Sequence, residues 1–257
     1  MKKVIVASFQ RSGTHFLINN LITNFEGFEL GWVDVFNSRL RQAAAEAKTV
    51  DFRERIWDQL RTYYPLPKRQ CVKTHYQMYF FEPWLEAILE MYDIIYVVRD
   101  PRDTMVACYH YYNQTSYEPF VKEPVFSKFL RAELGKVETE TDPYSYSLVK
   151  PRNIVDKWHK HVLSWLPYQD KGVLFVKFSD LKFNLQETLR RIEKKTSQRL
   201  KPVIQEVLLN DSRVRPDFKL EGIRRGEVGV WRDYFSDDDQ KFLSQTLSEP
   251  VRQFFDK

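Results

Sequence analysis

Glycine, cysteine and long apolar runs are scarce in this sequence. Its 257 residues include 8 glycines and 2 cysteines, Cys71 and Cys108. Two cysteines are too few for a disulfide framework, and the low glycine content excludes a fibrous or low-complexity chain. No apolar stretch approaches the roughly 20 residues that a helix needs to cross a bilayer. The first apolar run starts at Val4 and stops at Phe9, so we interpret it as a strand and not as a signal peptide, and we expect a cytoplasmic protein with no membrane partner.

Long basic runs are also missing. The sequence has no run of five or more basic residues, no zinc-finger spacing and no RNA-recognition signature. We therefore do not expect nucleic acid as a partner. Lys and Arg together number 40 against 35 for Asp and Glu, which gives a formal net charge of +5. This modest excess is compatible with an anionic ligand.

Short apolar segments alternate with amphipathic segments along the chain. The predicted strands are Lys3–Phe9, Gln70–Thr74, Asp93–Val98 and Gly172–Phe178, and the predicted helices are Thr14–Asn24, Phe81–Tyr92, Pro101–Tyr112, Asn153–Trp165 and Leu181–Lys195. This alternation predicts an α/β fold of three layers, in which helices flank a central, mostly parallel sheet. Ligands of such sheets bind beyond the carboxyl ends of the strands, so the residues that follow each strand are the candidate site.

Two segments, residues 31–68 and 113–150, interrupt this alternation. The first carries helical patterns over Phe36–Lys48 and Asp51–Tyr63, and the second is polar and aromatic. Long insertions near strand ends commonly form lids or substrate loops. We therefore treat residues 1–257 as one domain with two insertions near the ligand site.

The segment QRSGTH, residues 10–15, joins the first predicted strand to the first predicted helix. It lacks the G-x-x-x-x-G-K-[ST] pattern of a loop that binds a nucleoside triphosphate. Even so, backbone N–H groups at a helix N-terminus bind anions, Gly13 permits close approach, and Arg11 adds a forked cation. The alternative is a plain strand-to-helix turn capped by a Ser or Thr.

Charged side chains follow the next two predicted strands. Lys73 and His75 are alternate residues at the end of the second strand, so they project to the same side, and His75 can act as a general base near neutral pH. The alternative is a solvated Lys and a His bonded to a neighbouring loop. Arg99 and Arg102 flank the turn after the third strand, where a second anion could bind. The alternative is a structural ion pair of Arg99 with Asp100 or Asp103, and this pair is compatible with an anion site.

A fourth basic segment, GIRRGEVGVW, occupies residues 222–231. Its two arginines lie between glycines, which predicts a flexible loop that closes over a phosphate. The alternative is a solvated surface loop.

These four segments, taken in order, resemble motifs of the sulfotransferases that use 3′-phosphoadenosine 5′-phosphosulfate (PAPS). SFQRSGTHF resembles the loop that binds the 5′-phosphosulfate, and KTH the strand end that carries the catalytic base. YVVRDPRDTMVACYHYY resembles the segment that binds the 3′-phosphate, and RRGEVGVW the closing C-terminal loop. The resemblance extends from Val4 to about Phe235.

The resemblance implies a role for each matching residue. The catalytic positions are Arg11, Lys73 and His75, with His75 as the general base. The positions that bind the cofactor are Arg11, Ser12, Gly13, Thr14, His15, Phe16, Arg99, Phe178, Arg224, Arg225 and Gly226. The implied reaction moves the sulfuryl group of PAPS in line to a hydroxyl or amine of a small-molecule acceptor and releases PAP. No metal is expected, because side chains supply the positive charge.

Three residues depart from the family pattern. Arg11 stands where most members have Lys, His15 replaces a Thr, and Ala107 stands where a Ser usually contacts the 3′-phosphate. The C-terminal segment also lacks the dimerisation signature of the animal cytosolic enzymes. Monomer and homodimer therefore both stay open.

Two other functions compete with sulfuryl transfer. An ATP-dependent kinase needs a loop that ends in Gly-Lys-[Ser/Thr] and an acidic residue that holds Mg²⁺, whereas the third strand here ends at Arg99. A non-catalytic nucleotide-binding protein needs no base such as His75. For the acceptor we predict a wall of aromatic and acidic groups, which suits a molecule that is flat, cationic or both. The predicted lining residues are Trp32, Asp34, Tyr76, Phe81 and Tyr112.

Overall fold

The computed structural model describes residues 1–35, 52–67, 69–114, 122–134, 151–207 and 226–256. Within them, five parallel strands form one sheet in the order β2-β3-β1-β4-β5. The strands are β1 (Lys3–Ser8), β2 (Trp32–Asp34), β3 (Cys71–Thr74), β4 (Tyr92–Val98) and β5 (Val173–Lys177). The central strand β1 pairs with β3 on one side and with β4 on the other, so the residues that follow these three strands emerge next to one another.

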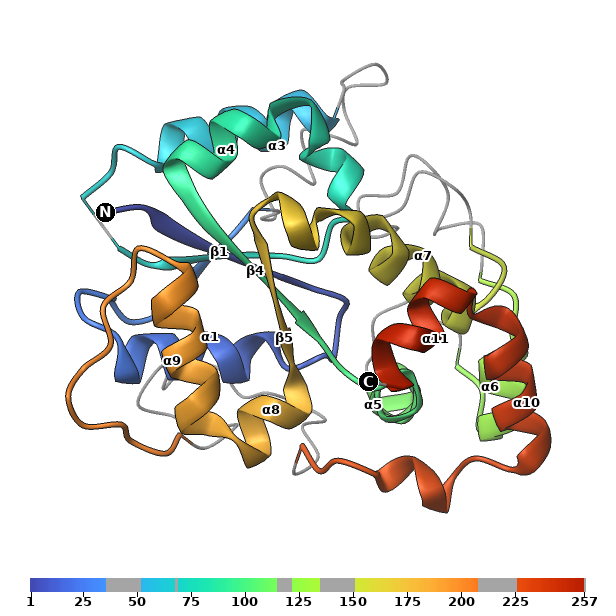
Figure 1. Ribbon diagram of the computed structural model, residues 1–257. Helices are drawn as coiled ribbons and strands as arrows, with labels where there is room; N and C mark the ends of the chain where they lie inside the picture. Colours follow the sequence, from blue (N-terminus) through green and yellow to red (C-terminus); the bar gives the residue numbers. More distant parts are fainter. Residues whose placement is uncertain (36–51, 68, 115–121, 135–150, 208–225, 257) are drawn as a thin grey trace.

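Helices cover both faces of this sheet (Figure 1). One face carries α1 (Thr14–Asn24), α8 (Phe178–Phe183) and α9 (Leu185–Lys195), and the other carries α3 (Phe52–Tyr63), α4 (Leu85–Met91) and α7 (Ile154–Trp165). Beyond one end of the sheet lie α5 (Pro101–Gln114), α6 (Phe126–Arg131), α10 (Asp237–Thr246) and α11 (Glu249–Asp256). The predicted three-layer α/β fold is confirmed.

Alternate residues of β1 face the two helical layers. Val4 and Val6 pack in the hydrophobic cluster that includes α1, α8 and α9, whereas Ile5 and Ala7 pack in the cluster that includes α3, α4 and α7. Every residue of β1 is buried. A strand covered on both faces is apolar throughout and shows no alternation of polar and apolar residues, which explains the continuous apolar run at the start of the sequence.

One strand of the sheet was not predicted, and the predicted helix before β4 is wrong in its bounds. The short strand β2 was not predicted, because three half-buried residues carry no apolar run. The predicted helix over Phe81–Tyr92 is instead a 3₁₀ turn, Glu82–Trp84, followed by the shorter helix α4. Tyr92 falls at the same helical spacing as Phe81 and Ile88, but it is the first residue of β4 and its side chain is buried.

The predicted helix Leu181–Lys195 divides at Asn184 into α8 and α9. Phe178, predicted as the end of the fourth strand, is the first residue of α8. The chain therefore passes from strand to helix with no intervening loop. As a result, the Phe178 ring lies against Gly13 in the loop that follows β1.

Parts of both insertions are described. The first contains β2 and α3, and the second contains α6, whereas the predicted helix Phe36–Lys48 lies outside the described residues. In the described ranges, no helix is both long enough and apolar enough to cross a membrane. The same ranges contain no group of three or more His, Cys, Asp and Glu side chains arranged to hold a metal ion.

Candidate active site

The loop between β1 and α1 has an unusual backbone. Gly13 lies in the left-handed region with φ of 100°, and Arg11, which is not a glycine, has φ of 64°. A Cβ atom on Gly13 would lie 2.8 Å from Cε2 of Phe178, which is closer than atoms can pack. Only glycine fits here, because any side chain would meet both the strained φ and the Phe178 ring. A positive φ at a non-glycine residue such as Arg11 is typical of functional sites.

The same loop gathers groups that suit an anion. The Ser12 hydroxyl is buried and has no hydrogen-bond partner among the described residues. The Thr14 hydroxyl lies 2.5 Å from the Ser8 hydroxyl at the start of α1, where the first backbone N–H groups have no partner within the helix. Burial lowers the pKa of Arg11, whose guanidinium lies 4.7 Å from the centre of the Tyr111 ring. A desolvated cation beside an unsatisfied hydroxyl fits a phosphate or sulfate.

His75 lies just beyond β3 and reaches across to β1. Its Nδ1 is 2.8 Å from the carbonyl oxygen of Ser8. Because a carbonyl only accepts, Nδ1 carries the ring proton and Nε2 carries the lone pair. Burial, with the charges of Lys73 and Arg11, lowers the pKa of His75 to about 3. The imidazole is therefore neutral at physiological pH, with its basic nitrogen directed away from Ser8.

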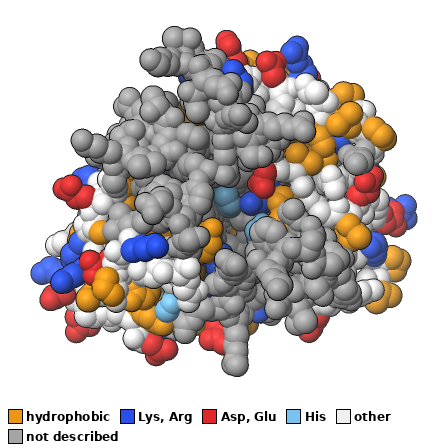
Figure 2. Space-filling model, turned by 180° about the vertical axis from the view of Figure 1, so that it is seen from behind, with side chains coloured by type: hydrophobic (Ala, Val, Ile, Leu, Met, Phe, Trp, Pro, Cys, Tyr) orange, Lys and Arg blue, Asp and Glu red, His pale blue; other side chains and the backbone are white. Residues whose placement is uncertain are grey.

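Lys73 extends from β3 toward β2, the strand that pairs with β3 on the side opposite β1. Its ammonium lies 3.1 Å from a carboxylate oxygen of Asp34 on the edge strand β2. The ring of Trp32, on the same strand, lies 4.5 Å from that of His15, centre to centre. The strand that the sequence did not reveal thus supplies the partners of two predicted site residues. Figure 2 shows the molecule from behind, where histidine side chains lie beside basic and acidic side chains.

Arg99, which follows β4, is held by two backbone carbonyls. Its guanidinium donates to the carbonyl of Arg11 over 3.2 Å and to that of Glu227 over 2.9 Å. It also lies 4.8 Å from the centre of the Phe178 ring. Burial lowers the pKa of Arg99, and its buried Nε has no hydrogen-bond partner in the described part of the chain. Arg99 thereby joins the loop after β1 to the C-terminal segment near Glu227.

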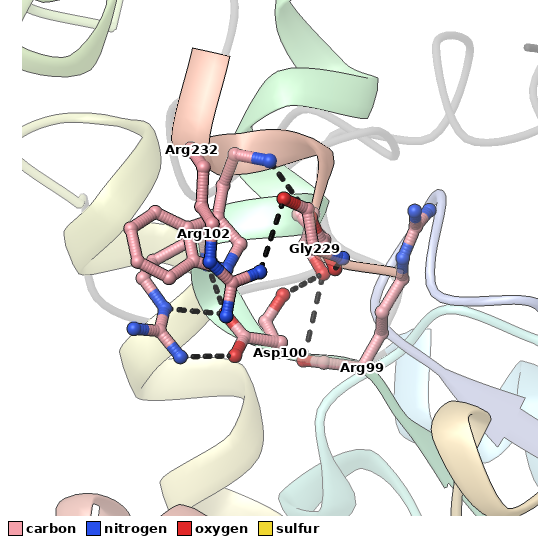
Figure 3. Close-up of polar contacts among 8 residues, drawn as sticks. Arg99, Asp100, Arg102, Gly229 and Arg232 are labelled. Atoms are coloured by element: carbon pink, nitrogen blue, oxygen red, sulfur yellow. Dashed lines mark hydrogen bonds and ion pairs between the residues drawn. The ribbon is translucent and has the colours of Figure 1, made fainter. Parts of the chain in front are cut away.

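Asp103 ties the same C-terminal segment to the first turn of α5. Its carboxylate accepts the backbone N–H of Gly229 over 2.8 Å and that of Trp231 over 3.1 Å. Asp100 accepts instead from Arg102, with distances of 3.0 and 2.6 Å from Nε and Nη2 (Figure 3). The ion pair of this turn is therefore Asp100 with Arg102, and Asp103 serves as an acceptor for backbone groups.

The remaining predicted residues fall in different surroundings. Phe16 and Phe178 are buried against one another, with ring centres 5.9 Å apart. Gly226 has φ of 59°, whereas Arg224 and Arg225 lie outside the described residues. Of the predicted acceptor wall, the rings of Tyr76, Phe81 and Tyr112 are buried in the core, whereas Trp32 and Asp34 keep partial exposure.

Two contributors were not identified from the sequence. Ser8 ends a strand and gave no polar signal of its own, yet its carbonyl orients His75. Asp103 was considered only as an ion-pair partner for Arg99, whereas it accepts backbone N–H groups 126 and 128 residues away. Contacts at that separation have no local pattern in the sequence.

The fold defines an α/β protein with a loop similar to a P-loop between its central strand and first helix, and this loop gathers groups that suit an anion. The chain belongs to the sulfotransferase domain family, whose model matches residues 1–255. The resemblance inferred from the four motifs is thereby confirmed for the family.

Curated relatives and solved structures agree with this assignment. Zebrafish (Danio rerio) sulfotransferase 6B1 is 24% identical over 165 residues, which cover 59% of this chain and 49% of that protein. Human (Homo sapiens) sulfotransferase 2A1 is 20% identical over 184 residues, which cover 63% and 59%. The match therefore spans about half of the length of these curated relatives.

Two solved structures share the fold over nearly the whole chain. Mouse sulfotransferase SULT7A1 in complex with PAP has a TM-score of 0.60 at 20% identity, covering 98% of this chain and 84% of that one. Retinol dehydratase in complex with retinol and PAP has a TM-score of 0.56 at 18% identity, covering 98% and 82%. These likenesses support the same α/β fold with a loop similar to a P-loop after the first strand.

Proposed function

We propose that this chain is a PAPS-dependent sulfotransferase that moves a sulfuryl group to a hydroxyl or amine of a small-molecule acceptor and releases PAP. The observation that carries the proposal is the convergence of one neutral imidazole and two cations on the loop after β1. His75 reaches the end of β1 from β3, Arg99 reaches the loop from β4, and Arg11 belongs to it. The charge of Lys73, which is paired with Asp34, acts on His75 from the same strand. A protein that only bound nucleotide would have no use for the base.

The residues present fit PAPS in two places. The loop amides, the Ser12 hydroxyl and Arg11 would hold the 5′-phosphosulfate, where the buried hydroxyl has no partner among the described residues. Arg99, with Gly226 and the arginines at 224 and 225, would hold the 3′-phosphate. The ring of Phe178 lies against both Gly13 and Arg99, and Phe16 packs on Phe178. When bound, PAPS supplies an activated sulfuryl group on a phosphate leaving group.

The base of the proposed reaction is Nε2 of His75. The bond from Nδ1 to the Ser8 carbonyl fixes the tautomer that leaves Nε2 able to accept a proton from the acceptor hydroxyl or amine. The lowered pKa of His75 keeps this nitrogen unprotonated before the ligand arrives. An anionic ligand near the ring would raise the pKa again, because it stabilises the charged imidazolium.

The cations act on the departing oxygen. Negative charge develops on that oxygen as the sulfuryl group leaves, and donors already fixed in place stabilise it most effectively. Arg11 is held over the Tyr111 ring, and Lys73 is held by Asp34. Side chains thus supply the positive charge that a metal ion supplies in many kinases.

The acceptor would enter beside β2. Trp32 offers a partly exposed aromatic face, and Asp34 offers a carboxylate that is 40% exposed although it pairs with Lys73. A flat molecule with a cationic group would stack on the ring and approach the carboxylate. The rings of Tyr76, Phe81 and Tyr112 are buried in the cluster on the opposite face of the sheet from the one against which Trp32 packs, so they are not part of this wall.

A ligand titration tests the proposal against its rivals. We expect PAP to raise the melting temperature with and without Mg²⁺, and ATP to raise it less. A larger shift from ATP that depends on Mg²⁺ would favour a kinase. We then expect the protein to release PAP from PAPS with at least one acceptor in a panel of phenols and amines. The His75→Ala variant should lose this activity, and its matched control is His159→Asn, since His159 bonds to Ser248. Binding of PAP without release from any acceptor would favour a non-catalytic binding protein.

A further inference from the structure

The segment that carries the proposed base has left the sheet. β3 ends at Thr74, which pairs with Ala7, and the next three residues form no strand or helix. The carbonyl of His75 therefore has no partner in the strand ladder. An irregular segment of this kind would let the imidazole turn unless other groups fix its backbone.

Helix α7 holds this segment through three side chains. His161 Nε2 lies 2.9 Å from the carbonyl oxygen of His75, and Trp165 Nε1 donates to the carbonyl of Tyr76 over 3.1 Å. The Ser164 hydroxyl accepts the backbone N–H of Met78 over 3.1 Å. One face of α7 thus serves residues 75–78 of the chain.

The His161 contact is the one that reaches the base. Because the carbonyl of His75 only accepts, Nε2 of His161 carries the proton, and Nδ1 is left to accept from the Tyr96 hydroxyl at 2.8 Å. Tyr96 is fully buried on β4, and His161 is 2% exposed. Burial lowers the pKa of His161 to about 3, which keeps the ring neutral and this donor pattern intact.

Phe9, which directly precedes the loop after β1, packs against the same histidine. The Phe9 ring lies 5.5 Å from that of His161, centre to centre. A buried chain of two hydrogen bonds therefore runs from Tyr96 on β4 through His161 to the carbonyl of His75, and the loop after β1 begins beside it. These bonds join β4 to the segment that carries the proposed base.

We propose that His161 is a positioning residue for sulfuryl transfer: its Nε2–H fixes the carbonyl of His75, and Tyr96 fixes the tautomer in which His161 can donate. The inference rests on the proposed role of His75 as the base. The ring of His75 is then held from two sides, at Nδ1 by the Ser8 carbonyl and at its backbone by α7. Holding a base in place this way contributes to rate, because small misplacements of reacting groups cost about 100-fold.

Two substitutions at His161 separate positioning from packing. His161→Gln keeps an amide N–H at the reach of Nε2, whereas His161→Asn is too short to reach the carbonyl of His75. With 2-naphthol and 2-phenylethylamine as probe acceptors, we expect His161→Asn to lower kcat by about 10-fold to 100-fold. KM for PAPS and the stoichiometry of PAP binding should stay within about 3-fold, and His161→Gln should recover most of kcat.

Two controls make this test specific. His159→Asn changes a histidine of the same helix that bonds to Ser248, and should leave kcat unchanged. His161→Asn in a His75→Ala background should not lower the residual rate further, because a residue that acts through His75 has no effect once that imidazole is gone. Without any substrate, the imidazole ¹⁵N shifts of His75 should change from a single tautomer to an average in His161→Asn.

The outcomes are separable. If His161→Asn keeps the wild-type kcat and His75 tautomer while His75→Ala is inactive, the positioning role is wrong and the proposed base stands. If both substitutions at His161 lower the PAP stoichiometry equally, His161 is structural and the inference is overturned. If His75→Ala retains turnover, the proposed base itself fails. Tyr96→Phe, which removes one hydroxyl without changing shape, should give a smaller loss of kcat than His161→Asn.

Discussion

His75 and Arg99 follow the two strands that flank β1, yet the molecule holds them in different ways. His75 is fixed by the carbonyl of Ser8 and by α7, both parts of the buried core. Arg99 is fixed by carbonyls of the loop after β1 and of Glu227, which is 128 residues further along the chain. The proposed base thus depends on core packing, whereas the arginine proposed to bind phosphate depends on the docking of a C-terminal segment.

The difference matches the proposed tasks. A base must keep its direction throughout the reaction, and core groups provide that rigidity. A residue that binds one end of a ligand benefits from a segment that can be ordered as the ligand binds. Substitutions on the His75 side should therefore change kcat, and substitutions on the Arg99 side should change affinity for PAP.

The largest effect is expected at His75. His75→Ala should lower kcat by about 100-fold to 10,000-fold, because the proton of the acceptor loses its base. The dissociation constant for PAP, measured by calorimetry, should stay within about 3-fold, since the ring is not assigned a contact with either phosphate. Near wild-type turnover would contradict the assignment and leave His15 as the next candidate.

The second effect is expected at Arg99. Arg99→Ala should weaken PAP by about 10-fold to 100-fold, since a charge-assisted hydrogen bond contributes about 1.5–3 kcal/mol. Adenosine 5′-monophosphate lacks the 3′-phosphate, so its affinity should change by less than about 3-fold. Equal losses for both nucleotides would show that Arg99 supports the loop after β1 instead of the 3′-phosphate.

A smaller effect on affinity is expected at Asp103. Asp103→Asn keeps one acceptor oxygen and replaces the other with an N–H donor, so one of the two backbone N–H groups loses its partner. Docking of the segment at Gly229 should therefore loosen, and PAP affinity should fall about 5-fold. Asp100→Asn is the matched control, because it breaks only the pair with Arg102 and should leave PAP affinity unchanged. If Asp103→Asn changed kcat and left PAP affinity unaltered, the assignment of the C-terminal segment to ligand affinity would be wrong.

The smallest effect concerns pH. The pKa values of His75 and His161 are lowered to about 3, against about 6.5 in an unfolded chain. Below pH 6.5 the unfolded state binds more protons, so the free energy of unfolding should fall as the pH drops toward 3. We expect the melting temperature to decrease between pH 6.5 and 5, and less steeply in His161→Gln, which has lost one titrating group. A melting temperature that is constant over this range would contradict the neutral, buried state of both rings.

Much of the site could be predicted from the sequence because its residues follow strands or begin helices. The bounds of α1 agree with the prediction, and the loop at residues 10–15 lies where the strand-to-helix pattern placed it. The positions of Lys73 and Arg99 at strand ends could likewise be predicted, because each lies where a short apolar run gives way to charged residues. The acceptor wall was harder to predict, because aromatic residues pattern alike in a core and in a pocket, and Tyr76 and Phe81 are buried.

The sequence by itself determined the alternation of strands and helices, the loop at Gly13 and the identity of the charged groups at the strand ends. Local rules suffice for these, since they depend on periodicity and on backbone preferences within a few residues. Only the tertiary structure decided the partners: Asp34 for Lys73, His161 for the carbonyl of His75, and Asp103 for the segment at Gly229. Each of these contacts joins elements that are distant in the chain, and packing of the sheet and helices alone brings them together.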